Sequence, residues 1–283
     1  FEPIPIPATS LLPMALLPLF GVLTAKELGA AYGNPLVLLM LGGFILAAAL
    51  ERSGAHRRIA LYMVRAFGGT SPRRLVFGFM CASAFLSMWI SNTSTTLMLL
   101  PVALAALEKT DDAKLAGPLL LGIAYAASIG GIGTPIGTPP NMVFMGVYSE
   151  VTGGAVSFGQ WMLWAIPVVL IMLPIAGLWI TRGVSKSGGV ALPEAEAWSA
   201  AERRVLIVFS ITALLWMTRK GPWGGWSEWL SLPYANDAMV AFLAVIALFV
   251  IPSGKQDSNG EPERLLDWQS AERIPWGMLL LSR

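Results

Sequence analysis

Residues 75–107 read LVFGFMCASAFLSMWISNTSTTLMLLPVALAAL and contain no charged side chain. A single helix of this length would extend about 50 Å, well beyond the roughly 30 Å hydrocarbon core of a bilayer. Two helical legs of half that length would reach only its middle. The polar triplet Ser91-Asn92-Thr93 lies at the centre of the run, where unsatisfied polar groups are costly in hydrocarbon. We therefore expect a re-entrant hairpin with a ligand-binding tip.

The composition indicates a multi-pass membrane protein. Of its 283 residues, 55% are hydrophobic and 13% are charged, with a mean hydropathy of +0.65, whereas soluble domains are about 25% charged. One cysteine and one histidine exclude an internal disulfide and a Cys/His metal cluster. Further charge-free windows have the length of a membrane-spanning helix, or nearly so: 28–50, 115–149, 151–181, 205–218 and 238–254.

The distribution of positive charge supports the hairpin. If residues 75–107 enter and leave on one side and 115–149 cross once, four loops share a side: 51–74, 108–114, 182–204 and 253–275. These loops hold all but four of the 19 Lys and Arg residues, so the positive-inside rule makes this side cytoplasmic. A full crossing at 75–107 would divide the charges almost evenly. On the cytoplasmic side, His56 to Phe67 has the pattern of an amphipathic surface helix.

A second polar interruption, SIGGIGTPIGTPPN at 128–141, contains four glycines and three prolines. These residues interrupt a helix, so this crossing is predicted to be two half-helices joined by unwound backbone. Such backbone is tolerated at membrane depth only inside protein or beside a polar cavity. Its carbonyl and side-chain oxygens suit Na⁺, and half-helix amino termini attract carboxylate. Neither interruption contains Lys or Arg, which favours cation-coupled uptake of an anion over a charge-paired receptor.

Several other interpretations of these polar segments compete with a ligand site. Polar side chains in membrane helices often bond a carbonyl one turn back, and Gly or Pro can serve packing alone; the triplet and the glycine-proline segment together favour the site. Capping or packing competes with ligand contact at Ser94, Thr95 and Thr96. The charge-free windows offer Ser91 no base, so an enzyme is not expected. A channel or non-transporting scaffold fits less well, because a tip facing a broken helix favours an occluded site.

The tryptophans expected to form an outer aromatic belt are Trp216, Trp223, Trp226 and Trp229.

Two runs, LSMWISNTSTTLMLLP (86–101) and GIGTPIGTPPN (131–141), resemble the divalent anion/sodium symporters, which are dicarboxylate, tricarboxylate and sulfate carriers of the ion transporter superfamily. Similarity extends from GGFILAAALERSGAHRRIAL (42–61) to LLDWQSAERIPWGMLLL (265–281). The resemblance implies an all-α, homodimeric elevator transporter of the cell membrane built from inverted repeats. It implies Na⁺ as coupling ion, no organic cofactor and no nucleic-acid partner. C4 dicarboxylates such as succinate, malate and fumarate are the favoured substrates, with citrate, sulfate or another divalent anion as alternatives.

The same resemblance suggests roles for individual residues. The sodium site would comprise Ser87, Ser91, Asn92 and the Gly137 backbone. The amino-terminal half of the substrate site would comprise Asn92, Thr93, Thr138 and Pro139. Ser87 precedes Ser91 by four residues, about one helical turn, so continuous helix would turn both hydroxyls toward one cation.

The resemblance also divides the chain. Scaffold-type transmembrane helices are expected at 1–50, an amphipathic arm at 51–72, and a transport-domain half at 73–156 with the hairpin at 73–108 and the broken helix at 113–150. Further transmembrane helices are expected at 157–252, and a cytoplasmic loop with the start of a second repeat at 253–283. A second SNT hairpin should follow IPWGMLLL, but the chain stops at Arg283. We therefore expect a fragment that carries half of the binding residues.

Overall fold

The computed structural model describes residues 6–68, 71–108, 114–184, 197–221, 224–256, 260 and 262–281. Its regular structure is almost entirely helical, which confirms the all-α prediction. The helices are α1 (Ile6–Thr9), α2 (Leu11–Leu19), α3 (Ala25–Tyr32), α4 (Pro35–Ser53), α5 (Ala55–Gly68), α6 (Pro72–Ser87), α7 (Asn92–Leu107), α8 (Ala116–Gly131), α9 (Pro139–Thr152), α10 (Phe158–Ile180), α11 (Ala200–Thr218), α12 (Gly225–Trp229), α13 (Asp237–Val250), α14 (Trp268–Ala271) and α15 (Trp276–Leu281). A short antiparallel ribbon, β1 (Pro252–Gln256) and β2 (Pro262–Arg264), was not predicted.

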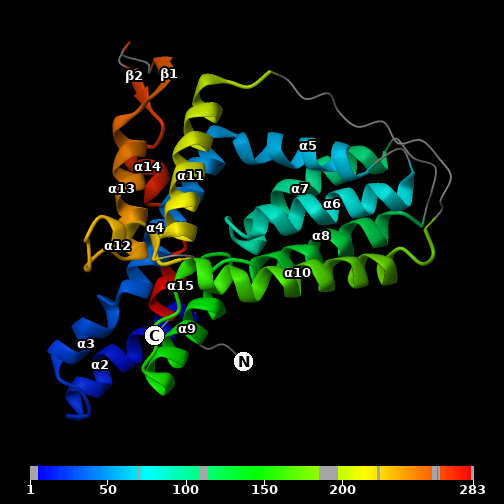
Figure 1. Cartoon of the computed structure of the whole chain (residues 1–283). Coiled ribbons are helices and arrows are strands. Elements are labelled where there is room, and N and C mark those ends of the chain that lie inside the picture. Colours follow the sequence, from blue (N-terminus) through cyan, green and yellow to red (C-terminus); the bar gives the residue numbers. More distant parts are fainter. Residues whose placement is uncertain are drawn as a thin grey trace.

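The longer helices form two groups (Figure 1). Helices α5, α6, α7, α8 and α10 lie side by side and are called the hairpin bundle. Helices α4, α11 and α13 pack together and are called the α4 bundle; in Figure 1 they cross the hairpin bundle steeply. The first turn of α10 reaches the α4 bundle near the carboxyl end of α11, so it is one of the places where the two bundles meet.

Helices α6 and α7 flank the polar triplet. Pro72 occupies the first turn of α6, where its missing N–H is no loss, and Ser71 caps that helix by accepting a hydrogen bond from the Arg74 N–H at 3.4 Å. Residues 88–90 form a turn, and Ser91 caps α7 by accepting from the Ser94 N–H at 3.1 Å. A helical hairpin thus surrounds the triplet, and its re-entrant placement in a bilayer stays a prediction.

The glycine-proline segment separates α8 from α9, as its composition predicts. Residues 132–138 are not helical, and α9 begins with Pro139 and Pro140. Helix α8 packs closely on α6 because glycines face it. A Cβ on Gly122 would lie 3.1 Å from the Met80 side chain, and one on Gly130 would overlap the backbone of Ala84. This packing brings the segment beside the hairpin turn.

Apolar side chains cover much of the outer surface. In the described part of the chain, α4 and α10 are long and apolar enough to cross a bilayer, and α7, α8 and α13 are shorter apolar helices. Helix α10 exposes large aliphatic residues, including Leu163 at 76% and Leu170 at 66%. Such a surface fits lipid better than water. The 28–50 window, however, contains two helices, because Asn34 caps a new helix with its side chain 2.8 Å from the Leu36 N–H.

The predicted aromatic belt is only partly correct. Trp216 is 1% exposed and packs inside the protein, whereas Trp229 is 71% exposed. The Trp216 ring stacks on Phe158 with centroids 4.5 Å apart, and its indole N–H has a buried acceptor. Trp216 is therefore a core residue, since its ring and its polar atom are both satisfied inside. Trp223, Ser282 and Arg283 lie outside the described residues.

Candidate functional site

The hairpin turn brings two predicted ligand side chains into direct contact. The Ser87 hydroxyl donates a hydrogen bond to Asn92 Oδ1 at 2.6 Å, and Ser87 is fully buried. The one-turn helical spacing expected between Ser87 and Ser91 is not present, because α6 ends at Ser87 and Ser91 has extended backbone with ψ of 148°. The residue that Ser87 meets is instead Asn92, five positions further along. The turn thus brings the buried Ser87 hydroxyl together with the amide oxygen of the half-buried Asn92.

The glycine-proline segment is anchored to this turn and to itself. The Asn141 amide donates two hydrogen bonds, to the carbonyl oxygens of Gly131 and Thr134, both at 2.8 Å. The Thr134 hydroxyl donates to the carbonyl oxygen of Met88 in the hairpin turn. These bonds satisfy carbonyls that helix would otherwise pair, which is how buried irregular backbone remains tolerable.

Glycines allow the segment to approach the turn closely. A Cβ on Gly131 would lie 2.5 Å from Asn92 Oδ1, and a Cβ on Gly137 would lie 3.0 Å from the Ser87 carbonyl oxygen. A Cβ on Gly133 would lie 2.8 Å from the Met88 side chain. Only glycine leaves room for both the turn and the segment here. The site residues Ser87, Asn92 and Gly137, far apart in sequence, are therefore neighbours in space.

This arrangement offers oxygen ligands without a fixed positive charge. The Ser87 hydroxyl, the Asn92 amide oxygen and the nearby carbonyl of Ser87 are hard donors suited to an alkali cation. Ser91 Oγ already accepts the capping bond from Ser94, although a hydroxyl oxygen has a second lone pair. The described residues contain no His/Cys/Asp/Glu group that could hold a metal ion. The oxygens at the hairpin turn are uncharged, which suits a monovalent cation better than a divalent one.

The predicted substrate residues lie at two helix starts. Asn92 and Thr93 open α7, and Thr93 is exposed. Thr138 is the N-cap residue of α9, yet its side chain makes no capping bond. Pro139 and Pro140 lack N–H groups, so the start of α9 offers an anion fewer donors than the sequence suggested. The α7 start is the better anion-binding terminus.

Two residues that stabilise the site were not singled out from the sequence. Asn141 was quoted as the last residue of the 128–141 segment and was given no role. Its position directly after Pro139 and Pro140, in the first turn of a helix, is the sequence signal for a side chain that turns back toward the glycine-proline segment. Trp161 donates its indole N–H to the Ile132 carbonyl oxygen at 2.8 Å, and no local pattern pointed to that contact. Beyond the tip, the Thr96 hydroxyl donates to the Asn92 carbonyl one turn back at 2.8 Å. This bond within the helix fits the alternative in which Thr96 has a structural role and does not contact a ligand.

Comparisons of the sequence with known proteins find transporters. The family model described as "Citrate transporter" (CitMHS) matches residues 1–282. A protein named sodium-dependent dicarboxylate transporter SdcS, from Staphylococcus saprophyticus, is 37% identical over 302 residues, covering 99% of this chain and 57% of the relative. Proteins of the same name from Staphylococcus aureus strains RF122 and NCTC 8325 are 36% identical with the same coverage. The chain therefore spans little more than half the length of these relatives.

The match bears out the predicted transporter resemblance and argues against the intramembrane serine enzyme. It also agrees with the predicted multi-pass membrane location, and the helices expose large apolar side chains. Because the family model extends over nearly every residue, from 1 to 282, the chain belongs to the citrate transporter family.

Proposed function

We propose that this chain forms the amino-terminal half of the binding site of a sodium-coupled carrier for di- and tricarboxylates, with C4 dicarboxylates favoured. The observation that carries the proposal is the meeting of the hairpin turn with the interrupted helix. Asn92 lies at this junction, in contact with Ser87 and against Gly131. The names of the Staphylococcus relatives include both sodium dependence and dicarboxylates.

In this proposal Na⁺ is held by Ser87, Ser91, Asn92 and the backbone at Gly137. Sodium binding would draw the Ser87 and Asn92 oxygens around the ion in place of their mutual hydrogen bond. The bound charge would then lower the repulsion that a dianion meets at an uncharged tip. Coupling follows because each ion improves the electrostatic environment of the other.

The substrate carboxylate is assigned to Asn92, Thr93, Thr138 and Pro139. The first turn of α7 offers N–H groups and a positive dipole end, and the Thr138 hydroxyl is not used for capping. Pro139 would shape the pocket rather than donate. A single carboxylate at this terminus leaves the rest of the anion to be bound by other parts of the protein.

The carrier would work as a homodimer by an elevator motion. The hairpin bundle other than α5 would move with its site relative to the α4 bundle, and α5 would be the arm between the moving helices and the α4 bundle. The exposed Arg57 and Arg65 on α5 suit a cytoplasmic membrane surface. Domain ranges and dimerisation remain parts of the proposal.

Uptake of radiolabelled succinate by vesicles containing the full-length protein tests the proposal. We expect uptake in sodium and background uptake when choline replaces sodium. Asn92→Ala should abolish uptake while membrane insertion is kept. Gln269→Ala removes an exposed amide on α14 and serves as the matched control, with unchanged uptake.

Three results would count against the proposal. Uptake that is unchanged when choline replaces sodium would exclude sodium coupling. A fully active Asn92→Ala variant would exclude the proposed binding site at the hairpin turn. If unlabelled sulfate inhibited uptake and unlabelled succinate and citrate did not, the substrate would be an inorganic divalent anion and not a carboxylate. Each result concerns a different part of the proposal, so they can be separated.

A further inference from the structure

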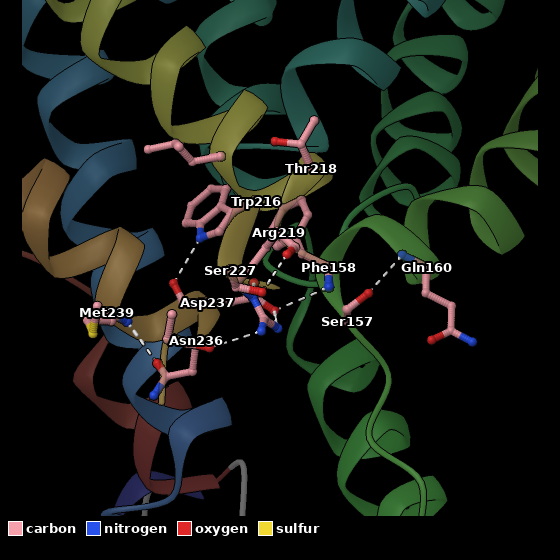
Figure 2. A network of polar contacts seen from close by, with 12 residues as sticks. Ser157, Phe158, Gln160, Trp216, Thr218, Arg219, Ser227, Asn236, Asp237 and Met239 are labelled. Atoms are coloured by element: carbon pink, nitrogen blue, oxygen red, sulfur yellow. Dashed lines mark hydrogen bonds and ion pairs between the residues drawn. The ribbon is translucent and has the colours of Figure 1, made fainter. Parts of the chain in front are cut away.

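A buried ion pair lies outside the candidate site, where α11 ends and α13 begins. Arg219 donates to Asp237 from Nε to Oδ1 at 2.5 Å and from Nη2 to Oδ2 at 3.0 Å (Figure 2). Arg219 also donates from Nη1 to the Ala235 carbonyl at 3.1 Å, and the two charged residues are 6% and 8% exposed. Burying two charges is tolerable only with geometry this complete.

This pair holds the first turn of α10. Asp237 Oδ2 accepts a hydrogen bond from the Phe158 N–H at 3.2 Å, and Trp216 donates its indole N–H to the Asp237 carbonyl at 2.8 Å (Figure 2). The Phe158 ring lies on the Trp216 ring, tilted by 13°. A Cβ on Gly159 would lie 2.6 Å from the Met217 carbonyl oxygen, so the turn sits directly on the end of α11. A carboxylate at a helix start is favourable because it meets free N–H groups and the positive dipole end.

The same turn of α10 touches both parts of the candidate site. The Phe158 ring lies 6.3 Å from the ring of Trp89, at an interplanar angle of 15°. Trp89 belongs to the hairpin turn, between Ser87 and Ser91. Trp161, one helical turn after Phe158, donates to the carbonyl of Ile132, the first non-helical residue after α8. Two aromatic side chains of α10 therefore bracket the turn and the glycine-proline segment.

We propose that Asp237 and Arg219 are positioning residues for the candidate cation site, acting through Phe158 and Trp161. This inference rests on the function proposed above. Neither charged residue contacts the site. Without the Asp237 charge, the Phe158 N–H loses its anionic acceptor and the Arg219 guanidinium loses its counter-ion. The first turn of α10 is then no longer held in a fixed position against the end of α11. Trp161 then holds Ile132 less firmly, and the Ser87 and Asn92 oxygens lose the spacing that suits Na⁺.

Sodium titrations of succinate uptake by the full-length protein test the inference. The variants are Asp237→Asn, Trp161→Phe and their combination. Trp226→Phe is the matched control, because it removes an indole–carbonyl hydrogen bond of the same length, 2.8 Å to Leu215, away from the site. We expect each single site variant to raise the half-saturating sodium concentration about tenfold, the equivalent of one hydrogen bond. The half-saturating sodium concentration of the double variant should be close to that of either single variant, because both substitutions act through the same contacts of α10. The control should match wild type.

A purely structural role gives a different pattern. If Asp237→Asn lowers only the amount of protein in the membrane and leaves half-saturation unchanged, the inference is wrong. The inference would also be wrong if the rise in half-saturating sodium concentration in the double variant equalled the product of the two single rises. Such a result would show that Asp237 and Trp161 act on the site independently. Maximal uptake, corrected for the amount of protein, separates these outcomes from misfolding.

A readout that needs no transport keeps the inference separate from the proposed function. In a Cys81→Ser background, Thr93→Cys places a thiol at the exposed tip, and its maleimide labelling rate reports the geometry there. We expect Asp237→Asn and Trp161→Phe to change this rate in the same direction, and Trp226→Phe to leave it unchanged. Wild-type protein without sodium-dependent uptake would refute the proposed function alone; an unchanged labelling rate in both variants would refute the positioning role.

Discussion

Asn92 has three neighbours that define its position: the hydroxyl of Ser87, the Cα of Gly131 and the Thr96 side chain on its own carbonyl. An amide in apolar surroundings is costly unless its polar atoms find partners. Here Asn92 Oδ1 accepts a hydrogen bond from the Ser87 hydroxyl. Gly131 lies so close to this oxygen that there is no room for a Cβ, so the position of the amide depends on the glycine as well as on Ser87.

Gly131→Ala tests this dependence at the residue scale. The new Cβ would lie 2.5 Å from Asn92 Oδ1, closer than van der Waals contact allows, so the amide must rotate away from Ser87. We expect the half-saturating sodium concentration for uptake to rise by about tenfold or more, in line with the loss of one hydrogen bond. A sodium titration of uptake, normalised to protein in the membrane, measures this.

Gly117→Ala is the appropriate control for that change. It also lies in α8, but a Cβ there meets nothing within 4 Å, and alanine favours helix by about 1 kcal/mol over glycine. Its sodium dependence should equal that of wild type. If both variants behaved alike, the close approach between Gly131 and Asn92 would have no bearing on the cation.

Helix ends and helix contacts determine the site at the scale of elements. Ser71 and Ser91 start α6 and α7, and Pro139 starts α9, so each helix begins where a capping residue or proline allows it. The elements then approach one another through glycines. Gly42 of α4 faces Ala241 of α13, where a Cβ would lie 2.6 Å from the alanine Cβ. The α4 bundle therefore relies on small residues, as is common between membrane helices.

Gly42→Val should loosen the contact between α4 and α13. Overpacking of this kind typically costs about 1–3 kcal/mol, and we expect a lower thermal unfolding midpoint in detergent. Gly146→Val in α9 is the control, since the nearest atom to its Cβ would be a Leu36 methyl at 3.8 Å. Equal midpoints for the two variants would contradict the close packing of α4 on α13.

At the scale of the whole molecule, the two bundles are joined at few points. Helix α4 passes into α5 through Gly54, whose φ of 80° belongs to the left-handed region. His56 donates from Nδ1 to the Leu50 carbonyl at 2.9 Å across this joint. Arg58 of α5 pairs with Glu202 of α11 at 2.8 Å and lies over the Trp198 ring. These contacts, the start of α10 and the edge-to-face contact of Trp89 with Phe209 of α11 connect the bundles.

His56, the one histidine of the chain, makes this joint pH-sensitive. Burial lowers the pKa of His56 below its ordinary value of 6.5, the Leu50 carbonyl opposes this, and Arg57 adds to the lowering. The unfolded chain therefore takes up a proton before the folded protein does. Stability contributed by neutral His56 is present above about pH 6.5 and is lost as the pH falls below it.

We expect the thermal unfolding midpoint of the wild type to decrease between pH 7 and pH 5, measured in detergent. His56→Gln lacks this titration, so its midpoint should change less over the same interval. The difference between the two curves isolates His56 from other groups. Parallel curves would show that His56 titrates alike in both states and is not part of a pH-sensitive joint.

Most of the local architecture could be predicted from the sequence because it depends on local chemistry. Charge-free runs predicted apolar helices, the polar triplet predicted the break between α6 and α7, and glycine and proline predicted the break between α8 and α9. The Ser87 prediction shows the limit of this reasoning. Its spacing from Ser91 assumed continuous helix, and the turn at 88–90 brought Asn92 to it instead. A turn's internal conformation depends on what packs against it, here the Thr134 hydroxyl on Met88.

Hydropathy, charge asymmetry and the two polar interruptions follow from residue order alone. They sufficed to identify a helical membrane protein and to predict a small-ion site where the interruptions meet. The roles of Trp161, Asn141, Trp216 and the Arg219–Asp237 pair came only from the tertiary structure. Each of these side chains finds its partner more than a helical turn away, on another element or on the unwound segment. Such partners are selected by the packing of whole helices, because an indole N–H or a buried charge is satisfied by whichever group the fold places within hydrogen-bond distance.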